Sequence, residues 1–261
     1  MDLTWARLRE RYLVAGDDAI VALNKPVGIS VTGERHDTDI VELAAADGVT
    51  LYPVHRIDKV TSGLVLLATD LTAHGELTRQ FNKQTADKRY LAVVSGADLP
   101  DRGTIDLPLS VGRKNRVRIA APREAIRSAD DESGARRWYV EDGDLLAAKH
   151  YPSLTEFATL FRDADRAVLA LRPVTGRRHQ IRVHLAWIGH EILGDPLFDR
   201  SDTFERTYLH SWRLGLTASW RKPPALDVDA PPGADFWHPV PAAGTDILDG
   251  VSDFIEVNQI T

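Results

Sequence analysis

The chain has 261 residues, of which 43% are hydrophobic and 27% charged, and its formal net charge is −6. This composition is that of an ordinary globular protein with a substantial core, and no apolar run approaches the roughly 20 residues that span a bilayer. The absence of cysteine excludes disulfides, thiol nucleophiles and thiolate metal sites. The N-terminal sequence MDLTWARLRERYLV lacks the features of a secretory signal, so we expect a cytoplasmic protein without a membrane segment.

The acidic residues are concentrated near the C-terminus. Residues 226–261 contain seven Asp or Glu and no Lys or Arg, so the part of the chain before them is close to neutral. Within that part, residues 113–127 carry six cationic side chains and a single acid, Glu124. A local basic surface can bind phosphates whatever the net charge of the chain. A solvated loop face is the alternative interpretation of this run, and the sequence does not separate the two.

Strand and helix patterns alternate in the N-terminal part. Residues 20–23 show a strand pattern that runs into a predicted turn over residues 25–28. The apolar run at residues 63–68 predicts a buried strand. Residues 70–84 then place apolar side chains four positions apart, which predicts a helix with Asp70 at its N-cap.

Further strands and long polar segments follow. Residues 88–96, KRYLAVVSG, alternate as a strand does and end at a glycine. Residues 110–151 are polar, first basic and then acidic, which predicts an insert rather than core. The segments 154–161 and 168–174 predict a hairpin, and the proline-rich residues 223–241 predict an extended, peripheral chain.

A second cluster of polar residues occupies positions 175–195, TGRRHQIRVHLAWIGHEILGD. Apolar residues recur at helical spacing from Ile181 onward, and Gly189 stands where a helix C-terminal cap is expected. The predicted start of this helix carries Arg177, Arg178, His179 and Arg182. Cations at a helix N-terminus oppose its dipole by about 0.3–1 kcal/mol each, so we expect an anion nearby. A phosphate would serve, and for Arg182 a buried acid, with Asp58 as the candidate partner.

Three other chemistries do not match the spacing of the polar residues. His179 and His184 lie about 140° apart around a helix, unlike the i, i+4 pair of a zinc helix, so no metal is expected. Residues 55–58, HRID, displace the aspartate of a kinase HRD loop, and neither a DFG segment nor a glycine-rich phosphate loop is present. A serine hydrolase would need a GxSxG elbow, which does not surround Ser62.

Five segments of the sequence, in the same order, resemble those of the RluA-type pseudouridine synthases. HRIDKVTSGLVLLATD is similar to the family's HRLDxxTSGLLxxA motif, and LNKPVGISV is similar to its KPxG segment. KRYLAVVSG resembles KxYxAxxxG, TGRRHQIRVHLAWIGHEILGDPLF resembles GRxHQIRxHLxxxGHPIxGDxxY, and YLHSWRLGL resembles LHAxxL. The matches run from Asn24 to about Leu216, and their order makes them far more specific than HRID alone.

The resemblance implies which residues carry the reaction. Asp58 falls on the family's essential aspartate, Tyr90 on its active-site tyrosine and Arg182 on the basic residue that pairs with the aspartate. Family enzymes isomerise uridine in RNA: the bond from ribose C1′ to N1 breaks, the uracil turns, and C5 bonds to C1′, without metal or cofactor. Asp58 is suited to act there as nucleophile or as base, and the sequence leaves both open. Tyr90 is suited to stack on the uracil, and its hydroxyl to assist removal of the C5 proton.

RNA contacts are expected in the catalytic domain itself. The residues before Lys25 are too few for the S4-like N-terminal module of longer relatives. The target base must leave its helix, and Arg56 matches the family position suited to filling the vacated stack; a salt bridge that orients the loop is the alternative. We expect rRNA or tRNA to be bound by His55, Arg56, Arg177, His179, Arg113, Lys114, Arg116 and Arg118.

The expected fold class is α+β, with a mixed, largely antiparallel central sheet flanked by helices and a central active-site cleft. One catalytic domain is expected over residues 1–225, with residues 110–151 as its insert. The acidic, proline-rich extension 226–261 is expected to pack on the same domain, and the protein to be a monomer.

Two departures from the family pattern and two other functions complete the predictions. Isoleucine replaces leucine in HRID, which conserves volume, and Glu191 replaces the proline of GHPI without touching a reacting group.

The main alternative function is a non-catalytic RNA-binding or RNA-chaperone protein on the same fold. A nucleoside or sugar hydrolase would need a second carboxylate, and none stands out.

Overall fold

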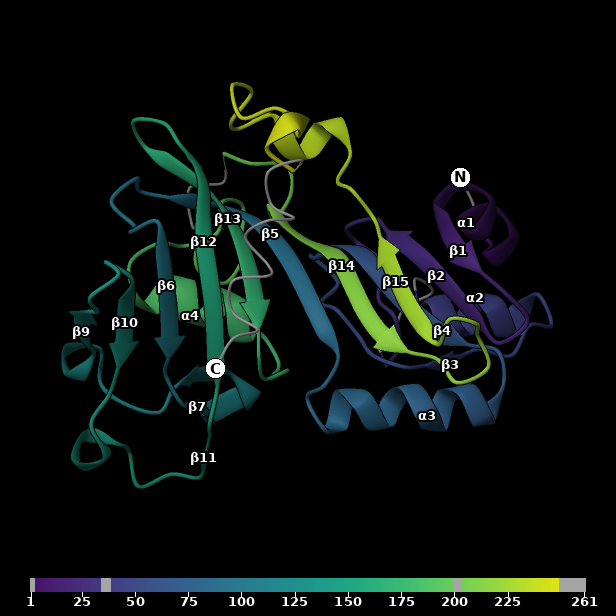
Figure 1. Cartoon of the computed structure of the whole chain (residues 1–261), viewed down its shortest axis with the longest axis horizontal. Helices are drawn as coiled ribbons and strands as arrows, with labels where there is room; N and C mark the ends of the chain where they lie inside the picture. Colours follow the sequence, from purple (N-terminus) through teal and green to yellow (C-terminus); the bar gives the residue numbers. More distant parts are fainter. Residues whose placement is uncertain (1–2, 34–38, 200–202, 249–261) are drawn as a thin grey trace. The chain divides into compact units, whose positions relative to one another are not determined.

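Strands outnumber helices in the described part of the chain, which comprises residues 3–33, 39–199 and 203–248 of a computed structural model (Figure 1). The chain divides into two compact units. Unit 1 combines Met1–Tyr90 with Leu209–Pro232, and unit 2 combines Leu91–Tyr208 with Gly233–Thr261. The strand β5 (Asp87–Ser95) crosses the division between Tyr90 and Leu91. The predicted division at residue 225 stays a prediction.

The sheet of unit 1 is built from apolar strands paired mainly antiparallel. Its strand order is β1-β2-β4-β14, with β3 pairing β4 and β15 pairing β14. The pair formed by β4 and β14 is parallel, and the other pairs with recorded registers are antiparallel. These strands are β1 (Leu13–Gly16), β2 (Ile20–Lys25), β3 (Tyr52–Pro53), β4 (Ser62–Ala68), β14 (Leu209–Thr217) and β15 (Ala225–Asp229).

Alternate residues of β2 and β4 face two different helical layers. Leu64 and Leu66 pack in a core cluster with α3 (Leu71–Asn82), whereas Val65 and Leu67 pack with α1 (Trp5–Tyr12) and α2 (Ile40–Ala46). Because successive side chains of a strand point to opposite faces, both faces of this sheet are covered. The predicted N-cap of α3 is confirmed, since Asp70 Oδ1 accepts from the backbone N–H of Thr72 at 2.7 Å.

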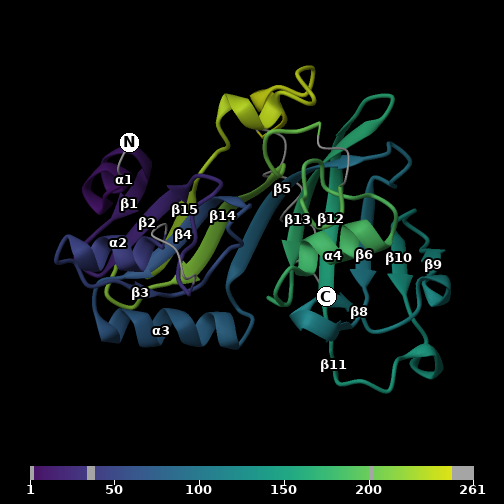
Figure 2. The same ribbon diagram turned by 180° about the vertical axis from the view of Figure 1, so that it is seen from behind.

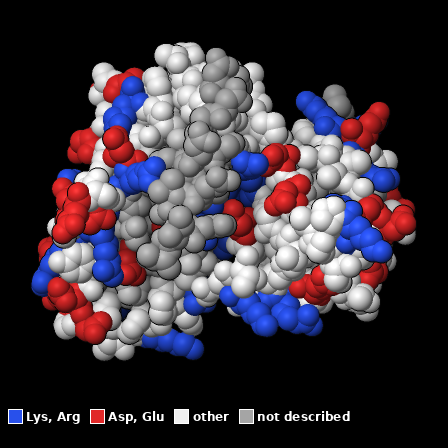
Figure 3. All heavy atoms as spheres, in the orientation of Figure 1, with Lys and Arg blue, Asp and Glu red and all other residues white. Residues whose placement is uncertain are grey.

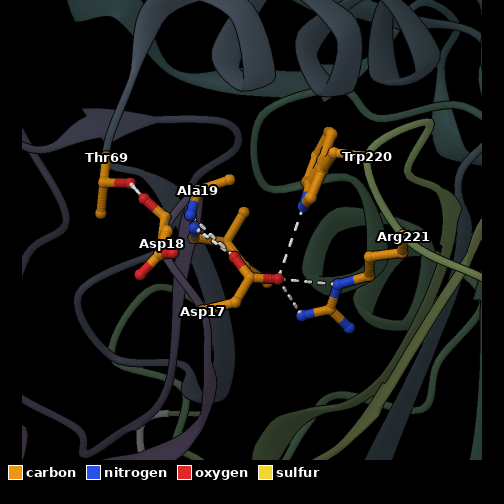
Figure 4. A network of polar contacts seen from close by, with 7 residues as sticks. Asp17, Asp18, Ala19, Thr69, Trp220 and Arg221 are labelled. Carbon is orange, nitrogen blue, oxygen red and sulfur yellow. Dashed lines mark hydrogen bonds and ion pairs between the residues drawn. The ribbon is translucent and has the colours of Figure 1, made fainter.

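A polar network ties the turn before β2 to the turn between β14 and β15 (Figure 4). Asp17 accepts a hydrogen bond from the backbone N–H of Ala19 at 2.8 Å and from Arg221 Nε at 2.8 Å. Trp220 Nε1 donates to the same carboxylate at 3.4 Å. Burial would raise the pKa of Asp17, but these hydrogen bonds outweigh it and lower the pKa. Two turns far apart in the sequence are thereby held together within unit 1.

Unit 2 contains a second antiparallel region and a small separate sheet. The strand order is β13-β12-β6-β10-β9, in which only the β6–β10 pair has a parallel register among those recorded, and the small sheet has the order β11-β7-β8. These strands are β6 (Arg102–Asp106), β7 (Leu109–Val111), β8 (Val117–Ile119), β9 (Arg127–Asp130), β10 (Arg136–Tyr139), β11 (His150–Tyr151), β12 (Leu154–Arg162) and β13 (Arg166–Pro173). The helix α4 (Gln180–Trp187) lies against β12 and β13, as Figure 2 shows.

Most predicted elements are confirmed, and two expectations need correction. The hairpin of β12 and β13 is present, and Gly189 adopts a left-handed φ of 97° after α4, as a helix cap requires. The C-terminal stretch is not wholly peripheral, because Phe236 and Trp237 are buried in a short 3-10 helix. Residues 110–151, predicted as a long excursion or flexible insert, contain the short strands β7 to β11.

The predicted α+β class, with a mixed and largely antiparallel sheet, is confirmed, whereas the predicted cleft stays a prediction. No helix in the described ranges is long and apolar enough to cross a membrane.

Candidate active site

Asp58 opens a tight turn in the loop that leads into β4. The backbone N–H of Thr61 donates to the carbonyl of Asp58 at 3.0 Å, so the aspartate does close a turn. On either side of Arg56 the residues Val54 and Ile57 are buried, at 5% and 6% exposure, whereas Arg56 is exposed and Asp58 half-buried. Two apolar anchors therefore fix the loop while its charged side chains face outward.

Residues of the predicted turn 25–28 form hydrogen bonds with the loop that contains Asp58. Lys25 is fully buried, and its Nζ donates to the carbonyls of Ile29 at 2.7 Å and Lys59 at 3.4 Å. The Lys59 carbonyl also accepts from the backbone N–H of Gly28 at 2.8 Å. A buried ammonium is stable only with such partners. The sequence analysis assigned Lys25 to a turn and missed this role, although the KPxG resemblance had already marked the segment.

The phenol of Tyr90 lies where the charge of Asp58 affects it. Burial raises the pKa of Tyr90 to about 12, a hydrogen bond with Ser211 opposes this rise, and the negative charge of Asp58 adds to it. The ring packs against the core cluster that contains Ile57. Unit 1 thus brings Asp58 and Tyr90, two of the three predicted catalytic residues, into electrostatic contact.

The glycine of TSGL is required by the position of Ser211. Gly63 pairs with Ser211 across β4 and β14 and has a φ of 106°. A Cβ at Gly63 would lie 2.1 Å from the Ser211 carbonyl oxygen, a distance that no real side chain tolerates. Ser62 is bonded at 2.8 Å to Nδ1 of the buried His210. This close strand packing sets the position of Ser211, and hence of its hydrogen bond with Tyr90.

His55 makes its contacts inside unit 1. Its Nε2 accepts from the backbone N–H of Leu66 at 3.0 Å, and its ring stacks on Phe81 at 4.8 Å between centroids. Burial, with a contribution from the charge of Lys88, lowers the pKa of His55 to about 3. The ring is therefore neutral at physiological pH, so it offers no positive charge to RNA phosphates. The sequence prediction of RNA binding did not anticipate this structural role.

Arg56 is exposed two residues before Asp58. A Cβ placed on Gly33 would lie 3.8 Å from Arg56 Nη1, which locates the guanidinium beside the segment that follows β2. Within the described ranges, the guanidinium has no ion-pair partner. The salt-bridge alternative for Arg56 therefore has no support among those residues.

Arg182 forms a buried ion pair that the sequence analysis missed. Its Nε and Nη2 donate to the two carboxylate oxygens of Asp195 at 2.7 and 2.6 Å, and the side chains are 4% and 0% exposed. The predicted anionic partner was Asp58, which belongs to unit 1, and that pairing stays a prediction. A signal for Asp195 was present, because the matched segment GHEILGDPLF contains a Gly-Asp step after the helix.

The remaining predicted RNA-binding residues of unit 2 lie in two surface segments. Arg177 is exposed, with its guanidinium 5.4 Å from the centroid of the Tyr151 ring. His179 is the N-cap residue of α4 in the left-handed conformation, with a φ of 56°. The second segment joins β7 to β8 and carries Arg113, Lys114, Arg116 and Arg118, all exposed. In the described part of the chain, no group of three or more His, Asp or Glu side chains is arranged to hold a metal ion.

Known proteins are similar to this chain in sequence and in fold. The RNA pseudouridylate synthase family matches residues 19–187, well over half of the chain. The chain is 34% identical over 208 residues to the dual-specificity RNA pseudouridine synthase RluA of Escherichia coli, covering 77% of this chain and 84% of that protein. It is 30% identical over 232 residues to an uncharacterised RNA pseudouridine synthase of Zymomonas mobilis, covering 86% and 95%.

Two solved structures share the fold. Human RNA pseudouridylate synthase domain containing 4 superposes with a TM-score of 0.68 at 23% identity, covering 90% of this chain and 94% of that one. Human RNA pseudouridylate synthase domain containing 1 gives 0.63 at 22% identity, covering 85% and 83%. The architecture and the matched motifs define an isomerase that acts on RNA. The chain belongs to the RNA pseudouridylate synthase family, and within it to the RluA type.

Proposed function

We propose that this pseudouridine synthase isomerises specific uridines of rRNA or tRNA with Asp58 as its essential carboxylate. The supporting observation is the turn at Asp58, which Lys25 and Gly28 fix through the Lys59 carbonyl. The charge of Asp58 reaches the phenol of the half-buried Tyr90 from that turn. A carboxylate held rigidly beside an aromatic ring is suited to act on a ribose whose base stacks on that ring.

The chemistry assigns different tasks to the two side chains. Asp58 acts at the ribose, either as nucleophile on C1′ or as base, while the C1′–N1 bond breaks and the uracil turns. C5 then bonds to C1′, C5 loses its proton and N1 gains one, so atoms and charge balance without a cofactor. With a pKa near 12 the Tyr90 phenol keeps its proton, so it stacks on the base and donates a hydrogen bond.

Base flipping follows from the buried position of the glycosidic bond in a paired helix. Removal of a nucleotide from the stack costs a few kcal/mol, which contacts in the enzyme pocket must offset. Arg56 is exposed beside Asp58, and a planar guanidinium can stack in the space that the base leaves. We assign Arg56 this role.

We assign Arg182 two roles, one in the fold and one in the active site. Its pair with Asp195 fixes the guanidinium inside unit 2. A planar guanidinium matches the geometry of carboxylates and phosphates, and we assign Arg182 to the active site because it matches the family's basic residue.

The test is the substitution of Asp58. Pseudouridines would be mapped in total RNA from cells with the wild-type protein, without it, and with Asp58→Ala. We expect Asp58→Ala to give the same map as the absence of the protein, and Asp18→Ala, an exposed carboxylate in the same unit, to give the wild-type map.

The mapped positions would also identify the substrate RNA. Turnover by Asp58→Ala close to the wild-type rate would overturn the catalytic assignment. A wild-type protein that binds RNA but changes no position would favour the non-catalytic RNA-binding alternative.

A further inference from the structure

A pocket in unit 2 is lined by none of the residues assigned to the reaction. It has a volume of about 580 Å³ and is lined by Gly112, Arg113, Lys114, Arg116, Val117, Arg118, Trp187 and Phe198. Four cationic side chains from the β7–β8 hairpin thus face two aromatic rings, one at the end of α4 and one in the loop that follows Asp195. The RNA pseudouridine synthase reaction as described above uses none of these groups.

The cations of this pocket differ from three other arginines of the insert. Arg127, Arg136 and Arg137 each form an ion pair, with Asp144 at 3.1 Å, Asp130 at 2.6 Å and Asp106 at 2.6 Å. Figure 3 shows acidic and basic side chains interleaved over β9 and β10 accordingly. The pocket cations Arg113, Lys114, Arg116 and Arg118 have no carboxylate partner among the residues that the structure describes. Their charge is therefore available to an external anion.

The hairpin that carries these cations is held in a fixed shape. The backbone N–H of Gly112 donates to the carbonyl of Arg116 at 2.7 Å, and Lys114 and Asn115 adopt left-handed φ values of 55° and 60°. Arg178, just before α4, donates to the Asn115 carbonyl and so ties the hairpin to the helix start. A fixed hairpin reduces the entropy cost of binding a ligand.

The Arg123 guanidinium lies over one face of the pocket tryptophan, Trp187. Trp187 is half-buried at the end of α4, and the Arg123 guanidinium lies 5.9 Å from its ring centroid. Arg123 also donates to the Ala186 carbonyl, which fixes its position. Phe198 is half-buried as well. Half-buried rings beside unpaired cations match how proteins hold single-stranded nucleic acid, where bases stack on aromatic side chains and cations follow the phosphates.

We propose that this pocket binds an unpaired nucleotide of the RNA, with the base stacked on Trp187 and the flanking phosphates held by Arg116 and Arg118. In a paired helix the faces of the bases are covered by their neighbours, so only a single-stranded or looped nucleotide can enter. The enzyme then recognises an unpaired segment in addition to the target uridine. The inference rests on the family's action on RNA and does not depend on the role proposed for Asp58.

The test measures binding to RNA that cannot fill the catalytic site. The probe is a short, fluorescently labelled oligoadenylate, which contains no uridine, compared with an RNA duplex of the same length. We expect the full chain to prefer the single strand, and Trp187→Ala to weaken that binding about 5- to 150-fold, equivalent to ~1–3 kcal/mol of stacking, with little effect on the duplex. Trp187→Phe retains a ring and should bind more tightly than Trp187→Ala.

Charge and fluorescence provide independent readouts. Arg116→Ala and Arg118→Ala should each lower the slope of log affinity against log salt by about 0.7, whereas Arg9→Ala, an exposed cation on α1, should not. Oligoadenylate should quench tryptophan fluorescence, and loss of that quenching in Trp187→Phe would assign it to this ring among the six tryptophans of the chain.

Three results would overturn the proposal. These are unchanged oligoadenylate affinity in Trp187→Ala, equal weakening of single strand and duplex, and displacement of oligoadenylate by polyglutamate at equal charge, which would reduce the site to a nonspecific anion surface. Thermal melting checks that each variant folds, and Phe198→Leu replaces Trp187→Ala if the latter does not fold. Loss of turnover in Asp58→Ala tests the proposed function separately, because oligoadenylate binding does not depend on it.

Discussion

The loop HRID and the helix segment HQIR look alike in the sequence, yet the structure uses them in opposite ways. In HRID, residues 55–58, Ile57 is buried, Arg56 is exposed and Asp58 is half-buried. In HQIR, residues 179–182, everything from Gln180 onward is buried, including the guanidinium of Arg182.

This difference separates the segment that we propose to be reactive from one that supports the fold. A charged group that must meet a substrate has to remain partly solvated, and the backbone around Asp58 is fixed by hydrogen bonds to its neighbours. A charged group inside the core has to be paired, as Arg182 is with Asp195, because an unpaired buried charge costs several kcal/mol. We therefore expect substitutions in HRID to reduce turnover and substitutions in HQIR to reduce stability.

The largest effect is expected at Arg182. Arg182→Met leaves Asp195, at 0% exposure, without its partner, which should lower the free energy of unfolding by about 3–5 kcal/mol. Arg213→Met is the matched control, because it breaks an Arg–Asp pair whose side chains are 33% and 53% exposed and should cost less than ~1 kcal/mol. Urea denaturation of both variants makes the measurement.

The same denaturation experiment on Asp58→Ala completes the comparison. Its unfolding free energy should stay within about 1 kcal/mol of the wild type, since it removes a partly exposed side chain. A variant Arg182→Met as stable as the wild type would show that the ion pair does not support the fold, and the contrast between the two segments would be lost.

Acid should destabilise the HRID loop and the helix α4 through their neutral histidines, His55 and His184. Burial lowers the pKa of His184 from 6.5 to about 4 and that of His55 to about 3. Both folded-state pKa values lie below that of the unfolded chain, so the stabilisation is complete above pH 6.5 and is lost as the pH falls toward the folded values. For His184 the loss amounts to up to about 3 kcal/mol.

Unfolding free energies measured by denaturation between neutral and mildly acid pH test this expectation. His184→Gln and His55→Gln should each lower the slope of the unfolding free energy against pH by the contribution of one bound proton. His150→Gln, which alters an exposed histidine, should leave the decline unchanged. An equally steep decline in both buried-site variants would contradict the assignment of these protons.

Strand and helix positions could be predicted from the sequence because apolar periodicity is local. The apolar runs of β2 and β4 and the helical spacing in α3 identified these elements. The helices α1 and α2, of eight and seven residues, were missed, whereas α4, also of eight residues, was identified with the help of its Gly189 cap.

Partners distant in the chain could not be predicted in this way. Ser211 reaches Tyr90 only because Gly63 lets β14 approach β4, and Asp195 reaches Arg182 from a loop beyond the helix. Asp58, Tyr90 and Arg182 were named through the family resemblance, which carries such long-range information. Lys25 shows the limit of reading residue types, because a lysine in a turn pattern gives no sign of being fully buried.

Tyr90 provides a prediction of intermediate size. Tyr90→Phe keeps the ring and its packing but loses the hydroxyl, so RNA affinity should hold while turnover falls about 10-fold, equivalent to one lost hydrogen bond of ~1.4 kcal/mol. Because the pKa of Tyr90 is about 12, a phenolate base would make the rate rise tenfold per pH unit through the alkaline range. We expect no such rise, since the neutral phenol is the active form.

Single-turnover rates from neutral to alkaline pH make this measurement. Tyr52→Phe, a half-buried tyrosine of the same unit, is the control and should react at the wild-type rate. A steady log-linear rise in the wild type that disappears in Tyr90→Phe would instead identify the phenolate as the base.

The smallest effect is expected where this chain departs from the family motif. Ile57→Leu converts HRID into HRLD at a residue that is 6% exposed, and such volume-conserving exchanges cost less than about 1.5 kcal/mol. Ile57→Ala, by contrast, leaves a cavity and should cost about 2–5 kcal/mol, which shows that the site is packed. Because Ile57 directly precedes Asp58, turnover is the sharper readout. Unchanged turnover in a stable Ile57→Leu would mean that the Lys59 carbonyl, held by Lys25 and Gly28, places the carboxylate, whereas a tenfold loss would mean that the shape of the buried neighbour places it.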